Sequence, residues 1–340
     1  MIIPVELGKN SYPIILERGA LSRLNEYLKL DRRVLIVTDD GVPAQYAKTV
    51  ADGCQDPVIV TVPTGEESKS FARMEQLCRV MLQNHFTRTD CVVAVGGGVV
   101  GDLAGFAAAS FLRGIDFYNI PTTVLSQVDS SIGGKVAVNM DAIKNCVGAF
   151  YQPKAVVIDP EVLNTLPPRQ ISNGLAEAVK MAVTFDEQLF TLFESENPIE
   201  KIDTVIEKSL RIKAQVVKED EKEAGLRRVL NFGHTIGHGI ESAAGLHQLL
   251  HGECVALGML PMCGDALRPR VKSVLQKLSL PVTCEVEFEA VWEALSHDKK
   301  LDGDTITVIR SEAPGKFEMC ALPLDSFRET VQNALSRKDG

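Results

Sequence analysis

The sequence predicts an α/β domain over residues 1–165 and a mainly α-helical domain over residues 166–340. Two observations predict this division. In the first half, short apolar runs rich in β-branched residues alternate with amphipathic stretches, which is typical of buried parallel strands that alternate with helices. After Leu166-Pro167-Pro168-Arg169 the apolar residues follow helical spacing instead. The chain of 340 residues also exceeds the usual size of a single core, which favours two domains.

Five apolar runs in the first half are predicted to be strands of one sheet. Each is short and bounded by turn signals, as expected for parallel strands buried on both faces. The predicted strands are residues 33–38, 57–62, 91–95, 116–120 and 155–159. The predicted helices of the second half are residues 172–184, 203–222, 235–244 and 252–266. Residues 305–310 and 316–320 flank Ala313-Pro314-Gly315 and predict a hairpin near the end of the chain.

The bulk composition excludes several classes of protein. A net charge of -9 argues against broad binding of nucleic acid or anionic membranes, but it allows a local basic pocket for a small phosphate ester. No apolar run reaches the ~18 residues of a membrane span, and the N-terminus lacks the features of a secretory signal. We therefore expect a cytoplasmic protein. The 8 cysteines form no Cys-x-x-Cys pair and predict reduced, mostly buried thiols.

A glycine-rich turn follows the predicted strand at residues 91–95. Gly96, Gly98 and Gly101 fit the pattern G-x-G-x-x-G ahead of a helix of small residues, where a pyrophosphate can approach the backbone. A tight turn with close helix packing explains the same residues. Because about ninety residues precede this turn, the strand order differs from that of an ordinary Rossmann fold. The polar loop at residues 63–70 suits ribose and phosphate, or it caps a helix with a solvated charge run.

Lysines accompany a second glycine turn between residues 121 and 145. Lys135 follows Gly133 and Gly134 directly, and Lys144-Asn145 comes soon after. Lysines near a glycine turn suit the recognition of phosphate or carboxylate as point charges. Surface lysines without a ligand are the alternative.

Histidines concentrate near the three-quarter point of the chain, where His234, His238, His247 and His251 are four of the six. On a helix, His234 and His238 share one face, so their spacing nominates them as metal co-ligands. The zinc-protease motif, in which glutamate follows the first histidine, does not fit, because Thr235 occupies that position. Glu177 lies three residues before Lys180 on a predicted apolar helix. The two side chains form a structural ion pair, or Glu177 completes a His-His-Glu zinc site.

The residues together resemble the 3-dehydroquinate synthases, with nine segments in the same order along nearly the whole chain. The matching segments are residues 65–69, 96–106, 121–139, 144–153, 165–169, 174–180, 225–238, 251–253 and 298–300. The resemblance implies an N-terminal α/β nucleotide-binding domain and a helical C-terminal domain, with the active site between them. It also implies bound NAD and one divalent metal, most often zinc, with cobalt as an alternative.

The resemblance implies a role for each matched residue. The implied metal ligands are Glu177, His234 and His251, rather than the pair His234 and His238 that spacing suggests. His238 is implied to face the substrate. The implied NAD contacts are Thr64, Gly65, Glu66, Glu67, Ser68, Lys69, Gly98, Val99, Val100, Gly101, Asp102, Thr122, Thr123, Lys135, Lys144, Val162, Leu163, Asn164 and Thr165. The implied catalytic and substrate residues are Asp129, Lys135, Asn145, Lys180, Lys213, Arg227, Asn231, His238, Arg113 and Lys300, with Lys299 as an alternative to Lys300.

The implied substrate is a phosphorylated sugar acid, 3-deoxy-D-arabino-heptulosonate 7-phosphate, and the implied product is 3-dehydroquinate with release of phosphate. Transient oxidation by NAD, phosphate elimination, reduction and an intramolecular aldol step make the enzyme a lyase with no net use of NADH. Arg113 resembles the residue that reaches the active site of a neighbouring subunit, which implies a homodimer. No nucleic-acid or membrane partner is expected.

Three departures from the family pattern flank matched positions, namely Ile143, the pair Met181-Ala182, and Leu246-His247-Gln248. They place local geometry in question more than reaction type. Another sugar-phosphate cyclase is the nearest alternative, and an iron-type alcohol or glycerol dehydrogenase is a second. A non-catalytic NAD-binding or scaffold protein is a third, because NAD-type motifs do not require turnover.

Overall fold

The computed structural model describes residues 1–141, 143–245, 248–296, 301–302 and 304–336. It divides into two compact units: unit 1 comprises Met1–Pro167 and Lys213–Lys222, and unit 2 comprises Pro168–Ile212 and Glu223–Gly340. The predicted division differs for one segment, since Lys213–Lys222 was placed in the second domain. This segment belongs to unit 1 because Lys213 pairs with Asp129, and because Gln152 Nε2 donates a 3.0 Å hydrogen bond to Glu221.

Unit 1 contains a seven-stranded sheet in the order β1-β2-β9-β6-β5-β3-β4. Only β1 is antiparallel to its neighbour. The strands are β1 (Ile2–Val5), β2 (Tyr12–Leu16), β3 (Arg33–Asp39), β4 (Asp56–Val62), β5 (Cys91–Gly96), β6 (Asp116–Pro121) and β9 (Ala155–Ile158). The five predicted parallel strands are confirmed. The glycine-rich turn follows β5, so the departure from Rossmann order is also confirmed.

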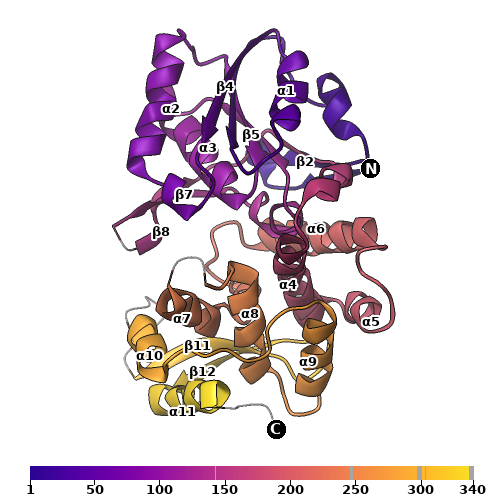
Figure 1. Cartoon of the computed structure of the whole chain (residues 1–340), viewed down its shortest axis with the longest axis vertical. Helices are drawn as coiled ribbons and strands as arrows, with labels where there is room; N and C mark the ends of the chain where they lie inside the picture. Colours follow the sequence, from indigo (N-terminus) through magenta and orange to yellow (C-terminus); the bar gives the residue numbers. More distant parts are fainter. Residues whose placement is uncertain (142, 246–247, 297–300, 303, 337–340) are drawn as a thin grey trace. The chain divides into compact units, whose positions relative to one another are not determined.

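The central strands of the sheet are buried on both faces, because their residues alternate between two apolar clusters, whereas the edge strand β4 is mostly exposed. Val34 and Ile36 pack with α1 (Ala44–Asp52) and the 3-10 turn Ala20–Glu26. Leu35 and Val37 point the other way and pack with α2 (Phe71–Gln83) and α3 (Gly98–Ser110), and Figure 1 shows these helices beside the sheet. This two-residue period explains why the strands read as continuous apolar runs.

A two-stranded hairpin, β7 (Lys135–Met140) and β8 (Ile143–Phe150), was not predicted from the sequence. Most of β8 is exposed, so it carries no apolar alternation that could reveal it. The predicted Gly-Gly turn precedes β7 and is confirmed, because Gly133 and Gly134 have positive φ angles of 93° and 67°.

Unit 2 is mainly helical, as predicted. Its helices are α4 (Pro168–Phe185), α5 (Glu187–Ser195), α6 (Ile202–Glu219, whose last residues belong to unit 1), α7 (His234–Ala244), α8 (His251–Met259), α9 (Arg268–Lys277), α10 (Phe288–Ser296) and α11 (Leu324–Ser336). The sheet β10 (Leu301–Asp302), β11 (Thr305–Arg310) and β12 (Glu318–Pro323) packs against α11 (Figure 1). The predicted hairpin is confirmed as β11 and β12.

Two predicted helices were too long. The helix predicted to reach residue 266 ends at Met259 as α8, and a 3-10 turn follows at Leu260–Met262 because Pro261 cannot donate an α-helical hydrogen bond. The helix predicted to reach residue 222 ends at Glu219. In the part of the chain that the structure describes, no helix is both long and apolar enough to cross a bilayer. All eight cysteines are free; three are buried, and Cys146 is exposed.

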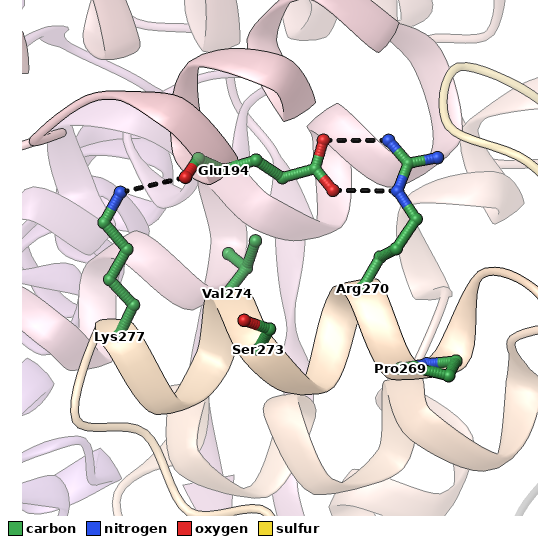
Figure 2. A pocket seen from close by; sticks show the side chains of 6 residues that line it. All are labelled: Glu194, Pro269, Arg270, Ser273, Val274 and Lys277. Carbon is green, nitrogen blue, oxygen red and sulfur yellow. Dashed lines mark hydrogen bonds and ion pairs between the residues drawn. The ribbon is translucent and has the colours of Figure 1, made fainter.

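A charged contact joins α5 and α9 at the surface of unit 2. Glu194 accepts two 2.8 Å hydrogen bonds from Arg270, and Lys277 Nζ donates to the Glu194 carbonyl at 3.3 Å (Figure 2). Lys277 also donates to the carbonyls of Phe193 and Glu196 at 3.1 and 2.6 Å. These lysine contacts satisfy carbonyl groups at the C-terminal end of α5, so the cluster stabilises helix packing.

Candidate functional site

One face of α4 holds the start of α8, where His251 lies. Arg169, Asn173 and Glu177 are four residues apart and therefore share this face. Asn173 Oδ1 accepts a 2.6 Å hydrogen bond from the N–H of Gly252. Arg169 donates to both carboxylate oxygens of Glu253 at 2.7 and 2.8 Å, and Glu253 in turn accepts the N–H of the residue before His251. His251 thus has a fixed backbone beside Glu177.

Glu177 presents one free carboxylate oxygen to two histidines. Its side chain is 1% exposed, and Oε2 accepts a hydrogen bond from the equally buried Lys180. Oε1 is buried, and among the residues that the structure describes it has no hydrogen-bond partner. It lies 3.6 Å from His234 Nε2 and 3.5 Å from His251 Nε2. A buried carboxylate oxygen without a partner is costly, so this position favours a bound cation.

Both histidines are oriented by a partner at Nδ1. His234 Nδ1 lies 3.2 Å from the carbonyl oxygen of Phe232, and His251 Nδ1 lies 3.0 Å from Glu241 Oε2. These oxygens can only accept, so each Nδ1 carries a proton, and each Nε2 faces Glu177. Metal-binding histidines have this arrangement, in which one nitrogen binds the metal and the other donates to an oxygen.

The carboxylates of Glu177 and Glu241 lie on either side of the His251 ring and favour a positive charge there. Burial alone would raise the pKa of Glu177, but Lys180, His234 and His251 hold it well below its ordinary value. Burial and the nearby Lys180 ammonium keep the pKa of His234 well below its ordinary value. Burial also opposes a charge on His251, but the carboxylates of Glu177 and Glu241 outweigh it and raise the pKa to about 10.

His238 completes a three-histidine cluster but differs from the other two. Ligand atoms of His234, His238 and His251 all lie within 4.8 Å of one another, so these three also form a possible metal site. The ring of His238 lies 5.3 Å from that of His234 and 5.6 Å from that of His251. The helical spacing therefore correctly predicted that His234 and His238 lie close together. The two differ in burial, because His234 is buried and His238 is exposed.

The predicted NAD residues of unit 1 gather at one edge of its sheet. Five parallel strands lie side by side in the order β4, β3, β5, β6, β9, and their carboxyl ends share this edge. Predicted segments follow four of the ends: 64–69 after β4, 98–102 after β5, 122–123 after β6 and 162–165 after β9. Open α/β sheets bind ligands at this edge. No side chain caps the start of α3 at Gly98, so its first-turn N–H groups are available to an anion.

Lys69 connects the first of these segments to α3. Its Nζ donates a 2.6 Å hydrogen bond to Asp102 Oδ2 and lies 3.8 Å from Glu66. Burial raises the pKa of Asp102, and the Lys69 ammonium opposes this effect. Glu66 accepts a 2.8 Å hydrogen bond from Asn139 on β7, and Asn139 accepts one from the backbone of Asn145 on β8. The predicted loop, the turn and the hairpin therefore form one network.

Several predicted cofactor residues cannot contact a cofactor through their side chains, because these side chains are buried. Val100, Val162 and Leu163 are 0%, 3% and 7% exposed and pack in the core. A contact from these positions to a ligand would have to come from backbone atoms. Lys135 and Lys144, in contrast, are exposed on the β7–β8 hairpin.

The predicted substrate residues are placed in two groups. In unit 1, Lys213 donates to the backbone and the carboxylate of Asp129. In unit 2, Asn231 Nδ2 donates a 2.8 Å hydrogen bond to Glu223, and Arg227 is buried. Arg113 is exposed in a turn after α3. Lys299 and Lys300, and also His247, lie outside the described residues.

The sequence interpretation missed two sets of residues near these sites. Asp39 ends β3 and Asp40 follows it, between two predicted cofactor segments, and Asp40 accepts a 2.7 Å hydrogen bond from the N–H of Thr64. A polar pair directly after a buried strand was the signal for them. Glu241 was also missed, although a carboxylate near the end of a helix with two histidines could have been noted.

Comparison with known proteins identifies the family. A model described as the N-terminal part of 3-dehydroquinate synthase matches residues 59–173, and a model of its C-terminal part matches residues 174–301. The chain belongs to the 3-dehydroquinate synthase family. A 3-dehydroquinate synthase of Enterococcus faecalis is 40% identical over 349 residues, which cover 96% of this chain and 98% of the relative. The resemblance seen in the sequence is confirmed.

Solved structures of related cyclases share the dehydroquinate synthase fold. A 2-deoxy-scyllo-inosose synthase complexed with carbaglucose-6-phosphate, NAD+ and Co2+ is 26% identical, with a TM-score of 0.90 over 98% of this chain and 100% of that one. A 2-epi-5-epi-valiolone synthase from Streptomyces hygroscopicus, with NAD+ and Zn2+ bound, is 27% identical, with a TM-score of 0.86 over 97% of both chains. The predicted fold class is therefore confirmed.

Proposed function

We propose that this chain converts 3-deoxy-D-arabino-heptulosonate 7-phosphate to 3-dehydroquinate and phosphate, as an NAD- and metal-dependent lyase. The observation that supports this activity best is the free Oε1 of Glu177 between the Nε2 atoms of His234 and His251. The family membership supports the reaction type, and the buried cations support an anionic substrate.

The proposed metal ligands are Glu177, His234 and His251. With bonds of about 2.1 Å, the ligand atoms of a tetrahedral zinc site lie about 3.4 Å apart. The distances of 3.5 and 3.6 Å from Glu177 Oε1 to the two histidines fit this geometry. Three protein ligands leave one position open to substrate, as in catalytic zinc sites. Zinc and cobalt, which the two related cyclases bind, are the metals we propose.

NAD is proposed to bind at the carboxyl edge of the unit 1 sheet. The first-turn N–H groups of α3 would hold its pyrophosphate, and Asp39 or Asp40 would accept hydrogen bonds from ribose hydroxyls. Bound NAD would supply reversible hydride transfer, and a metal held by Glu177, His234 and His251 would supply Lewis-acid polarisation of an oxygen. The chain's own lysines then hold the substrate: Lys180 and Lys213 supply fixed ammonium groups for its anionic oxygens.

A homodimer is proposed from the position of Arg113. This residue lies beyond the C-terminal end of α3, about 20 Å along the helix from the turn at Gly98. Leu112 and Arg113 both adopt left-handed backbone conformations, with φ angles of 49° and 68°. Such strain persists where the surrounding structure or a function requires it. We infer that Arg113 is presented to the active site of a second copy.

A phosphate-release assay tests the proposed activity. The purified protein with NAD should release phosphate from 3-deoxy-D-arabino-heptulosonate 7-phosphate without net formation of NADH. Treatment with a chelator should abolish the release, and zinc or cobalt should restore it. Net NADH formation with a simple alcohol would instead indicate a dehydrogenase.

A second sugar-phosphate cyclase activity is tested in the same assay, because the structural likeness to 2-deoxy-scyllo-inosose synthase extends over 98% of the chain. Glucose 6-phosphate and sedoheptulose 7-phosphate serve as the competing substrates. Turnover of either one, with none of the heptulosonate phosphate, would contradict the proposed substrate.

Replacing Lys69 with methionine should weaken NAD binding. Lys69 is 5% exposed and places an ammonium beside Glu66 and Asp102 in the proposed site. Loss of a charged hydrogen-bonding group costs about 1.5–3 kcal/mol, which corresponds to a roughly 10- to 150-fold higher Kd for NAD by calorimetry. The double variant K69M/D102N also removes the partly exposed carboxylate of Asp102, which Lys69→Met leaves without its ammonium partner. It should recover thermal stability but not NAD affinity, and normal affinity in both variants would contradict the assignment.

A further inference from the structure

Glu241 lies behind His251 on the side opposite to Glu177. Its Oε2 is 3.0 Å from His251 Nδ1, and its side chain is 17% exposed. His251 Nε2 faces Glu177 Oε1 at 3.5 Å. The imidazole therefore lies between two carboxylates, with Glu241 at Nδ1 and Glu177 at Nε2.

The two proposed histidine ligands are supported differently. His234 is 10% exposed at its side chain and donates to a backbone carbonyl, which is fixed by the chain itself. His251 is 32% exposed, so its ring has fewer packing contacts to hold it. Its backbone is fixed through Asn173 and Gly252, but this contact does not set the rotation of the ring. The hydrogen bond to Glu241 is the described contact that sets both the ring orientation and the position of its proton.

We propose that Glu241 is a positioning residue that makes His251 a metal ligand through Nε2. This inference rests on the proposed metal site and adds a residue to it. A carboxylate at Nδ1 fixes the proton there and increases the electron density at Nε2, which strengthens the bond to a metal. A neutral acceptor at the same position would keep the orientation but not the charge. Glu241 thereby sets metal affinity without touching the metal.

The test measures metal affinity rather than turnover. Wild type, Glu241→Ala and Glu241→Gln are stripped of metal, and the Kd for Zn2+ is measured by competition with a chromophoric chelator. We expect Glu241→Ala to raise this Kd by about 10- to 100-fold, and Glu241→Gln to raise it by a smaller factor of about 3 to 10. The melting temperature of the metal-free protein and the Kd for NAD should stay unchanged in Glu241→Gln.

Glu194→Gln is the matched control. It removes a paired carboxylate of unit 2 in the contact with Arg270, and it should leave the Kd for Zn2+ unchanged (Figure 2). A wild-type Kd in folded Glu241→Gln would overturn the inference, and this variant decides the question even if Glu241→Ala fails to fold. An equal loss of Zn2+ affinity in Glu194→Gln would also overturn it.

A wrong assignment of the metal ligands would give different Zn2+-binding results from a wrong role for Glu241. If the wild type binds no Zn2+, or if Glu177→Ala binds it normally, the ligand assignment itself is wrong. If both of these behave as expected and only Glu241→Gln is unchanged, the metal site stands and the role of Glu241 is rejected.

Discussion

Replacing Glu177 with alanine should yield a folded protein that retains no stoichiometric metal and has lost at least about a thousandfold in kcat/KM. The substitution removes one of three proposed ligands and leaves the ammonium of Lys180, 1% exposed, without its carboxylate partner. Metal polarisation of the reacting oxygen supplies several kcal/mol, and each 1.4 kcal/mol corresponds to a factor of ten in rate. Metal content is measured by elemental analysis of the purified protein, and kcat/KM by phosphate release.

The loss of the ion pair between Lys180 and Glu177 is a separate cause of damage, so it needs a control. Breaking a buried ion pair costs about 3–5 kcal/mol, because one charge stays behind without compensation. The double variant E177A/K180M removes that charge and should be more stable to denaturant than Glu177→Ala alone. It should still contain no metal. If metal loss were only a consequence of unfolding, the double variant would regain it.

His238→Ala gives the opposite pattern and decides between the two possible ligand sets. We expect this variant to keep one metal per chain and to lose activity, because His238 is proposed to face substrate. Full metal content in Glu177→Ala together with loss of metal in His238→Ala would instead assign the site to the three histidines, whose ligand atoms also lie close together.

In four of the five strands that the sequence predicted correctly, β3, β5, β6 and β9, burial controls composition, whereas the edge strand β4 is apolar although mostly exposed. Leu35 and Ile36 point to opposite faces of the unit 1 sheet, and both are 0% exposed, so the whole run must be apolar. β8 could not be found in the same way, because its exposed residues need no pattern. β1 and β2 each contain proline, Pro4 and Pro13, which weakens a strand signal.

The candidate metal site was only partly predictable, because its residues come from three helices. Spacing within one helix shows that His234 and His238 share a face, but it does not show what lies opposite that face. The partner of His234 in this structure is Glu177, more than fifty residues earlier in the chain. Its charge on an apolar helix left a zinc ligand and a structural ion pair as alternatives, and the family resemblance favoured the ligand. Its position depends on how α4, α7 and α8 pack, which is a long-range property of the fold.

That packing depends on a close backbone contact between α7 and α8, at Gly258. A Cβ atom at Gly258 would overlap the carbonyl oxygen of Gly233 and lie 2.7 Å from the backbone nitrogen of Gly237. Only backbone atoms are in the way, so no side chain can rotate to make room. The two helices can therefore approach closely enough to bring His234 and His251 to the same carboxylate oxygen.

Gly258→Ala should therefore lower the free energy of unfolding, although alanine is the better helix former. Helix propensity favours alanine by about 1 kcal/mol, whereas overpacking a rigid contact costs about 1–3 kcal/mol and more when backbone must move. We expect the steric term to win by about 1–2 kcal/mol in denaturant unfolding of the metal-free protein. The separation of α7 and α8 should also misplace His251 and lower Zn2+ affinity.

Gly53→Ala, where a Cβ meets the nearest atom at 3.4 Å, is the matched control and should be nearly neutral. Higher stability in Gly258→Ala with normal Zn2+ affinity would show that the two helices move apart at little cost, and that the glycine contact does not set the histidine geometry.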